Sequence, residues 1–410
     1  MEAIRLFRSL NRDQRNTFIA CFLGWALDAL DFFLLTFVFS AVAKEFGRTI
    51  PEVAFASMLT LMMRPLGALL FGMLGDRFGR RVPLMIDIVF YSVIELATAF
   101  SPNFAVFLIL RAVFGIGMGG EWGLGASLAM ETLPAKARGL FSGILQQGYA
   151  VGFLLAAIVY ALVFPHFGWR GLFVAGAMPA LLVIFIRTKV PESPAWERQR
   201  AKITTTARPF TETIRTHWRL FLYTIVLMTA FNCMSHGTQD LYPTFLQKQC
   251  GLAVGQVRNV SVIYSLGAIF GGTLLGFLSQ RWGRRKMIIV AAAFGLVLIP
   301  AWMFSPSLPF LIVGGFFMQF MVQGAWGVVP AHLNELSPPE LRGTFPGFAY
   351  QLGNLFAAPI AVVESKLAEH FTAANGGPAY STSLAMVTAI VFVVLIVVAA
   401  FGREARNIEF

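Results

Sequence analysis

The chain has 410 residues, of which 57% are hydrophobic and only 13% are charged, with a mean hydropathy of +0.69. Soluble domains carry about 25% charged residues, so the composition excludes an ordinary soluble protein and favours an all-α membrane protein. Cys21, Cys233 and Cys250 show no paired spacing. We therefore expect no disulfide framework, no metal site and no cofactor.

Long apolar runs recur from one end of the chain to the other. A helix that crosses the hydrocarbon core of a bilayer needs about 20 apolar residues. The first run is too long for a signal peptide and lacks a small-residue cleavage site, so we read it as a permanent span. The sequence predicts twelve spans, at 18–43, 54–75, 83–100, 104–130, 140–163, 169–188, 219–247, 257–280, 286–304, 308–332, 343–365 and 380–402.

The net charge of +11 follows this topology and does not indicate nucleic-acid binding. With both termini in the cytoplasm, six of the 32 Lys and Arg fall in outer loops and two in spans, which leaves 24 inside. This bias matches the positive-inside rule, and the basic loops are suited to anionic lipid. We predict a monomer in the cell membrane, of the bacterial inner-membrane type. The six outer residues are Lys44, Arg48, Arg170, Lys248, Arg258 and Lys366.

A ten-residue sequence pattern occurs twice in the chain. Gly72–Arg81 returns 204 positions later as residues 276–285, and Glu131–Pro134 returns as residues 335–338. Repeated halves built from membrane spans are typical of transporters with a central substrate site, rather than of enzymes. We predict bundles at 1–189 and 219–410. The polar stretch at 190–218 joins them, either as a short helix on the membrane surface or as a solvated tether.

Two sequence patterns, one in this block and one in the fourth predicted span, resemble those of the major facilitator superfamily. The block Gly72–Arg81 is similar to its loop between spans two and three, and Arg111-x-x-x-Gly115-x-Gly117 to its span-four pattern. The resemblance implies two pseudo-symmetric six-helix bundles. It also implies that Asp76 closes the inside by contacting the positive N-terminus of span eleven, near residues 342–344. Gln280 replaces this Asp in the second copy, so we expect a weaker contact there.

We assign three further residues to the same gate, namely Arg80, Glu131 and Arg138.

Span seven carries a more specific pattern, which runs from Asn232 to Thr244. It resembles the Asn-x-x-Ser/Thr-His-x-Ser/Thr-Gln/Thr-Asp-x-x-x-Thr pattern of the fungal lactate/pyruvate permeases and their bacterial relatives. Residues 24–33 in the first span are similar to the wider sialate:proton symporter family. The resemblance implies proton-coupled uptake of a small monocarboxylate such as lactate or pyruvate.

Charged side chains inside spans are costly and need a partner or a role. With a rise of 1.5 Å per residue, Asp31, Arg64 and Arg111 all lie roughly 18–20 Å from the inner face, so they can share one cavity. We favour Asp31 and Arg111 as the proton-coupling pair, and a structural ion pair is the alternative. Asp28 and Glu121 are the substitute proton sites.

Glu95 lies on span three, a peripheral position, and we assign it a structural role.

Several polar side chains are candidates for substrate binding. The fork of Arg64 suits a carboxylate, although pairing with Asp28 or Asp31 would also explain it. Asn232, His236 and Asp240 share one helix face because they are four residues apart. We assign Asn232 and His236 to the substrate, together with Arg111 and the amide of Gln351, and Asp240 to proton entry.

Other functions remain open. A sialic-acid or aromatic-acid proton symporter would share the same fold. A drug antiporter is disfavoured because span five lacks the Gly-Pro-x-x-Gly pattern. A non-transporting nutrient sensor is disfavoured because such sensors usually carry long signalling tails.

Overall fold

The computed structural model describes residues 2–202, 210–305, 307–372 and 376–410, and all of its regular elements are helices. The first bundle contains α1 (Glu2–Ser9), α2 (Arg12–Phe37), α3 (Phe39–Phe46), α4 (Ile50–Phe78), α5 (Arg81–Ala99), α6 (Phe104–Thr132), α7 (Arg138–Gln146), α8 (Gly148–Ala175) and α9 (Ala180–Lys189), with a 3-10 turn at Ala135–Ala137. The helix α10 (Pro194–Lys202) lies in the connecting stretch.

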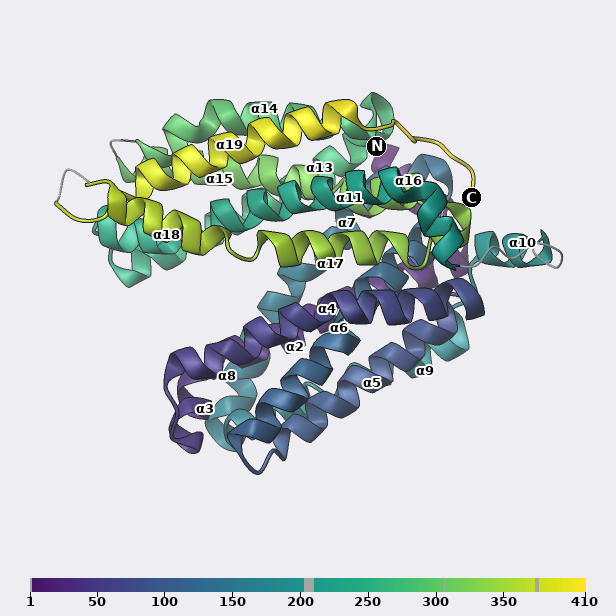
Figure 1. Ribbon diagram of the computed structural model, residues 1–410, viewed down its shortest axis with the longest axis horizontal. Coiled ribbons are helices and arrows are strands. Elements are labelled where there is room, and N and C mark those ends of the chain that lie inside the picture. Colours follow the sequence, from purple (N-terminus) through teal and green to yellow (C-terminus); the bar gives the residue numbers. More distant parts are fainter. Residues whose placement is uncertain (1, 203–209, 306, 373–375) are drawn as a thin grey trace.

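The second bundle contains α11 (Phe210–Gln239), α12 (Tyr242–Thr244), a π-helical turn (Phe245–Gln249), α13 (Val254–Trp282), α14 (Arg284–Met303), α15 (Leu308–Trp326), α16 (Val329–Leu336), a 3-10 turn (Pro339–Leu341), α17 (Phe345–Ala357), α18 (Ile360–His370) and α19 (Tyr380–Phe401). Figure 1 shows the two bundles and places both chain ends at the same end of the molecule. We call this the terminal end.

The predicted fold class is confirmed, but six of the predicted spans are divided between consecutive helices, and two of these breaks are described here. Within the described residues, ten helical segments are long and apolar enough to cross a membrane. The span at 169–188 is divided between the end of α8 and α9, and Gly168 interrupts α8 with a φ of 63°. The span at 343–365 is divided into α17 and α18 around Pro359, which has no N–H to continue the helix.

The repeat in sequence is also a repeat in structure. The helices α4 and α13 differ by 204 residues at both ends, and α6 begins 204 residues before α15. Gly115 and Gly119 let α6 approach α4, since an added Cβ would lie 2.2 and 2.0 Å from backbone oxygens of α4. Gly267 and Gly271 do the same between α13 and α15. Small residues at such crossings are what allow membrane helices to pack closely.

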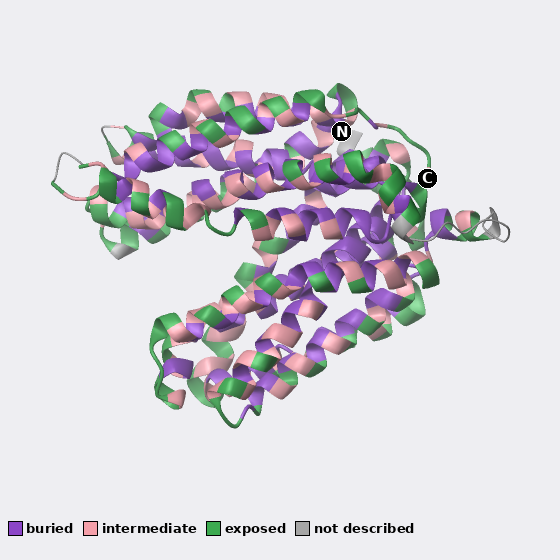
Figure 2. Cartoon of the chain, viewed as in Figure 1, coloured by how far each residue is buried: buried purple, intermediate pink, exposed green. Residues whose placement is uncertain are grey.

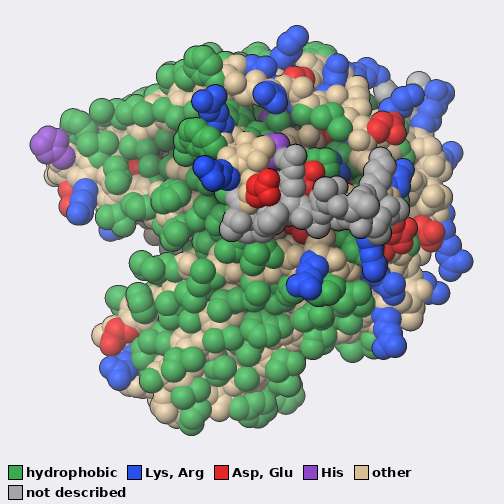
Figure 3. Space-filling model, turned by 45° about the vertical axis from the view of Figure 1, so that its right-hand side comes forward, with side chains coloured by type: hydrophobic (Ala, Val, Ile, Leu, Met, Phe, Trp, Pro, Cys, Tyr) green, Lys and Arg blue, Asp and Glu red, His purple; other side chains and the backbone are tan. Residues whose placement is uncertain are grey.

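The two bundles touch near the terminal end and diverge toward the other end (Figure 1). Ser127 donates a hydrogen bond to the carbonyl of Arg342 at 2.7 Å, and Ser142 donates to the carbonyl of Gly327 at 2.7 Å. Figure 2 shows buried residues concentrated where the bundles meet. At the opposite end the space-filling view is hollowed between the bundles (Figure 3), and we call this space the central hollow.

The outer surface is that of a membrane protein. Large apolar side chains are exposed on many helices, among them Phe270, Val297 and Phe401, the last of which is 84% exposed. Figure 3 shows this hydrophobic surface over the body of the molecule, with Lys and Arg gathered toward the terminal end. Contiguous apolar surface of this extent needs lipid around it, so the chain is a multi-pass membrane protein.

Candidate functional site

Ionisable side chains are buried in the interior of the first bundle. Arg64 lies on α4 and Arg111 on α6, and five carboxylates surround them, all at most 3% exposed: Asp28, Asp31, Asp87, Glu95 and Glu121. At the positions 204 residues later that correspond to those on α4 to α6, the second bundle has Ala268, Ala291, Ile299, Gly315 and Ala325. The pseudo-symmetry of the backbone therefore does not extend to this charge.

Arg111 is paired with Glu95 rather than with Asp31. Its Nη1 lies 2.6 Å from Oε2 of Glu95, and its guanidinium lies 4.1 Å from the ring centre of Phe114. The expected Asp31–Arg111 ion pair is absent from the described contacts. The depth of Glu95 along its span could have indicated this pairing. Glu95 lies 14 residues into α5 and thus about 21 Å from the inner end, the same depth as Arg111.

Asp31 is fully buried, and neither of its carboxylate oxygens has a hydrogen-bond partner. It still lies within electrostatic range of Glu95, Asp28 and Arg111. An unpartnered carboxylate in such surroundings is stable only when it is protonated or when a cation approaches. Asp31 therefore has the environment of a proton-exchanging group, although its neighbours differ from those predicted.

Arg64 is loosely held. Its Nη2 lies 3.8 Å from Oδ2 of Asp28, and neither Nε nor Nη2 has a hydrogen-bond acceptor. These two nitrogens form the side edge of the guanidinium that binds a carboxylate with two parallel hydrogen bonds. Tyr149 of the first bundle and Tyr350 of the second both lie within electrostatic range of Arg64. Arg64 thus lies near the boundary between the bundles, and two of its guanidinium nitrogens have no hydrogen-bond acceptor.

Asp87 was missed by the sequence reasoning. It is fully buried on α5, has no hydrogen-bond partner, and lies within electrostatic range of Glu121 and Asp28. Glu121 is also buried and unpartnered. With Asp87 included, the carboxylates of this cluster outnumber its guanidinium groups by three.

The predicted face of span seven is formed by α11. Nδ1 of His236 lies 3.1 Å from Oδ2 of Asp240, and Nε2 lies 3.2 Å from Oδ1 of Asn354 on α17. The side chains of His236 and Asp240 are 36% and 42% exposed, and Asp240 lies within electrostatic range of Tyr149 across the boundary. By contrast, Asn232 donates to the carbonyl of Met228 in its own helix at 2.8 Å.

Other polar side chains of the second bundle differ in whether they have hydrogen-bond partners. Gln319 donates to the hydroxyl of Tyr264 at 2.7 Å, and Tyr264 donates to the carbonyl of Thr238 at 2.7 Å. Gln351 is buried, and its amide has no partner. Glu364 on α18 is also buried and unpartnered, and the sequence reasoning did not find it, because it lies at the end of a predicted span.

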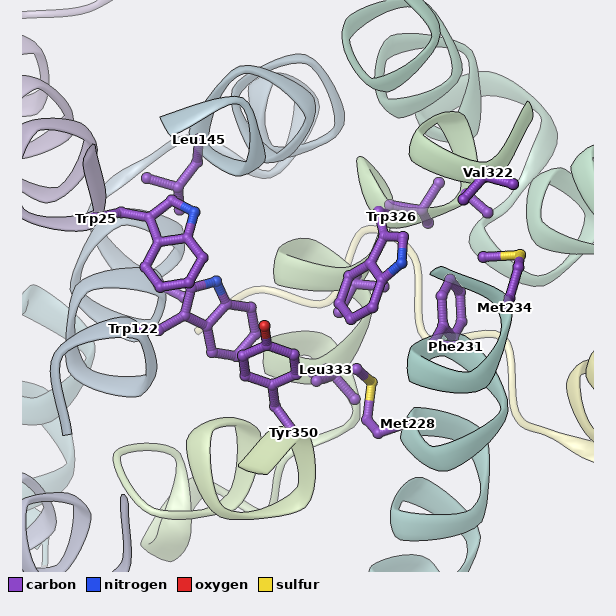
Figure 4. Close-up of a cluster of buried hydrophobic side chains, with 14 of the residues drawn as sticks. Trp25, Trp122, Leu145, Met228, Phe231, Met234, Val322, Trp326, Leu333 and Tyr350 are labelled. Carbon is purple, nitrogen blue, oxygen red and sulfur yellow. The ribbon is translucent and has the colours of Figure 1, made fainter. Parts of the chain in front are cut away.

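An aromatic layer crosses the boundary between the bundles (Figure 4). The ring of Trp122 lies 4.6 Å from that of Tyr350, and Tyr350 lies 5.5 Å from Trp326, measured between ring centres. Trp25 continues the layer into the first bundle and Phe231 into the second. The indole N–H groups of Trp25 and Trp326 have no acceptor.

Near the terminal end, Asp76 makes the contact that the resemblance implied. Its carboxylate accepts hydrogen bonds from the backbone N–H groups of Gly343 and Thr344, at 2.6 and 3.1 Å, and from the Thr344 hydroxyl at 2.6 Å. These groups lie at the start of α17, where the helix dipole favours a negative charge. The corresponding Gln280 accepts a single bond across the boundary, from the N–H of Gly139 at 3.1 Å.

The other predicted gate residues lie close to this contact. Arg80 forms ion pairs with Asp76 and Glu131, both at 3.0 Å, and Arg284 repeats the second with Glu335 at 2.9 Å. Arg138 does not join them.

Arg138 donates instead to the carbonyls of Met130 and Ile408, and its guanidinium lies 3.6 Å from the ring centre of Phe410. Among the described residues, no group of three or more His, Cys, Asp or Glu side chains is placed to hold a metal ion.

Comparisons with known proteins agree with this arrangement. Residues 21–219 match the family described as Sugar (and other) transporter, and residues 225–409 match the Major Facilitator Superfamily. A carboxylic acid transporter protein homolog of Saccharomyces cerevisiae is 30% identical, over 97% of this chain and 69% of its own length. The niacin transporter of Acinetobacter baylyi is 29% identical, over 94% of this chain and 93% of its own length.

Among solved structures, a proton:xylose symporter bound to 6-bromo-6-deoxy-D-glucose has a TM-score of 0.76 at 20% identity, over 96% of this chain and 97% of its own. This likeness concerns the fold. Together with the family matches and the relative at 30% identity, it leads to one conclusion. The chain is a membrane transporter that belongs to the major facilitator superfamily.

Proposed function

We propose that this transporter is a proton-coupled symporter that imports lactate or a similar short monocarboxylate by alternating access. The observation that carries the proposal is the free side edge of Arg64 at the boundary between the bundles. A buried guanidinium with unused donors is a good receptor for a carboxylate. Arg111 is less suitable, because Glu95 and Phe114 already occupy it.

The orientation belongs to the same proposal. With both termini in the cytoplasm of a bacterial cell, the central hollow opens outward, and the Asp76 contact closes the cytoplasmic side. The relative from Saccharomyces cerevisiae is named for carboxylic acids, which supports an organic anion as the substrate. The span-seven pattern, with His236 and Asp240 accessible, supports a monocarboxylate of the lactate class.

Proton coupling is supported by the excess of buried carboxylates. We assign the transported proton to Asp31, which has no hydrogen-bond partner, with Asp28, Glu121 and Asp240 as the other protonatable groups on the route. One proton moving with one anion makes net transport electroneutral.

A second candidate substrate is an aromatic or sialic-type acid. The aromatic layer favours the aromatic acid, because its flat side chains and the unpaired N–H groups of Trp25 and Trp326 suit a planar ring with polar atoms. The niacin transporter of Acinetobacter baylyi is consistent with this choice.

Uptake by the purified protein in proteoliposomes tests the proposal. An inward proton gradient should concentrate radiolabelled lactate, whereas a membrane potential without a pH difference should not. Nicotinate and sialic acid are measured in parallel, and preferential accumulation of either would replace lactate as the substrate. Accumulation driven by potential alone would contradict electroneutral symport.

Arg64→Lys tests the carboxylate receptor. Lys keeps the charge but loses the two-pronged edge, so we expect KM to rise about 10- to 150-fold, equivalent to about 1.5–3 kcal/mol for a charged hydrogen bond. Arg258→Lys, at an exposed site in the first turns of α13, is the matched control and should leave KM unchanged. An unchanged KM in Arg64→Lys would remove Arg64 from the substrate site.

A further inference from the structure

We propose that Glu364 is a proton-binding residue of the second bundle, which takes up its proton beside Gly237 and exchanges it with solvent through His236 and Asp240. The inference deepens the proposed symport, because it adds a proton site outside the first-bundle cluster. It stands on the geometry of α18 against α11.

The carboxyl group of Glu364 is enclosed. The residue is fully buried, and neither carboxyl oxygen has a hydrogen-bond partner. Gly237 of α11 makes the enclosure possible, since an added Cβ there would lie 3.0 Å from Oε1 of Glu364. The backbone carbonyl of Glu364 accepts a hydrogen bond from the Ser383 hydroxyl of α19 at 2.6 Å, which fixes this turn of α18.

The groups that face this carboxyl do not stabilise a negative charge. They are the Cys233 thiol of α11 and the carboxylate of Asp240, the residue that follows α11, and both lie within electrostatic range. From α19 the Ser383 hydroxyl donates to the backbone carbonyl of Glu364 and not to its carboxyl group. The basic groups of α18 itself, Lys366 and His370, are exposed.

An ionised carboxylate buried in a membrane without a partner costs several kcal/mol. Because Asp240 adds like-charge repulsion, the carboxyl of Glu364 is held as the neutral acid in this arrangement. The same argument predicts that it ionises when α18 moves away from α11 or when water reaches it.

The proposed route for the proton runs through His236 and Asp240. His236 is adjacent to Gly237 in the chain, its Nδ1 lies 3.1 Å from Asp240, and both side chains are more than one-third exposed. In the transfer, the imidazolium of His236 loses its N–H proton, Asp240 relays it, and the carboxylate of Glu364 gains it. The break between α17 and α18 at Pro359 lets α18 move on α11 while α17 stays against α4.

Infrared difference spectroscopy on the full-length protein tests the protonation directly, without any substrate. The parent should show a carbonyl band of a protonated carboxylic acid at neutral pH, and Glu364→Gln should remove one such band. Glu369→Gln changes an exposed carboxylate on the same helix and is the matched control, which should leave every band in place. A spectrum unchanged by Glu364→Gln would overturn the proposal.

A second variant covers the case in which Glu364→Gln does not fold. Gly237→Ala places a methyl group against the carboxyl and should shift the frequency of the same band, whereas an unshifted band would contradict the contact. In transport, Glu364→Gln should flatten the dependence of lactate accumulation on external pH, and Glu369→Gln should not. If no carboxylate is taken up at all, the proposed function fails while the infrared result still decides the fate of Glu364.

Discussion

Both ring nitrogens of His236 have a polar partner, one in Asp240 just after the end of α11 and one in Asn354 of α17. A histidine that only packs in a core is buried, as His332 is, whose ring nitrogens have no hydrogen-bond partner. His236 is instead more than one-third exposed. It therefore links two helices at an accessible position, as expected of a residue on a transport path.

We predict that His236→Ala impairs transport strongly and leaves folding nearly intact. The side chain is partly exposed and leaves no buried cavity, so the melting temperature should change little, whereas the Asp240 and Asn354 contacts are lost. Uptake is normalised to folded protein on the same sample. His332→Ala is the control for a packed histidine and should lower the melting temperature. A stability loss in His236→Ala with normal uptake per molecule would assign it to packing.

Sequence reasoning located most single residues of the buried charge cluster in the first bundle but not their partners. Depth along the spans correctly grouped Asp31, Arg64 and Arg111, because helix rise is regular. It could not show that Arg111 turns toward Glu95 on α5, because rotation about a helix axis depends on packing. Asp87 was overlooked for the same reason, since a polar residue in an apolar run gives no sign of the direction it faces.

At the level of elements, the stretch between the bundles caps a helix of the first bundle. The Glu192 carboxylate accepts hydrogen bonds from the backbone N–H groups of Arg80 and Arg81, at 2.8 and 3.1 Å, at the start of α5. Glu404 does the same for Arg284 and Arg285 at the start of α14. The prediction for this stretch, either a surface helix or a solvated tether, did not include a capping contact with the first bundle. Part of the stretch, 203–209, lies outside the described residues.

Burial raises the pKa of Glu192 above its usual value near 4.5, although the N–H groups of Ser193, Arg80 and Arg81 and the charge of Arg80 oppose this. The folded state therefore binds this proton more tightly than the unfolded state. The stabilising contribution of that proton is complete below the unfolded pKa and is lost as pH rises through the folded pKa.

We predict that Glu192→Gln removes this part of the pH dependence. Gln keeps an oxygen for the two N–H groups, so the melting temperatures of the variant and the parent should diverge in favour of Gln as pH rises above about 4.5. Glu192→Ala loses the cap and should cost about 0.5–2 kcal/mol at every pH. Parallel pH curves for Gln and the parent would show that the carboxylate keeps the same proton affinity on folding.

The repeat predicted the long helices of both bundles well, since α4 and α13 share one pattern of glycines and basic loop residues. The break at Pro359 was not predicted, because Pro359 stands in an apolar run that hydropathy reads as continuous and only its missing N–H ends the helix there. Gly168, by contrast, falls in the short gap between the predicted spans at 140–163 and 169–188. The break before α18 is also what carries Glu364 away from the axis of α17.

At the scale of the whole molecule, the two bundles have the same backbone and different chemistry. The first holds the buried charge cluster, and the second holds the accessible His236–Asp240 pair. Between them, the terminal end is closed by contacts that differ in strength, with three hydrogen bonds at Asp76 and one at Gln280. Closure at this end therefore depends more on the first copy of the repeat than on the second.

We predict that Asp76→Asn opens the terminal end. Asn keeps an acceptor for Gly343 but loses the charge that the start of α17 and Arg80 stabilise, so about 1.5–3 kcal/mol of closure should be lost. Ser127→Cys reports opening, because Ser127 is buried against Arg342, in a background without Cys21, Cys233 and Cys250. A thiol reagent applied from the terminal side should label this cysteine faster, by about tenfold or more.

Gln280→Asp is the matched change in the second copy. It places a carboxylate beside the N–H of Gly139 and the guanidinium of Arg284. In the parent, both groups donate hydrogen bonds to Gln280, the guanidinium at 2.7 Å. This should strengthen closure and slow labelling, so the two variants should move the same reporter in opposite directions. Equal labelling rates in the parent, Asp76→Asn and Gln280→Asp would mean that the glycine contacts of the bundles hold this end closed, and that the charged contacts only follow.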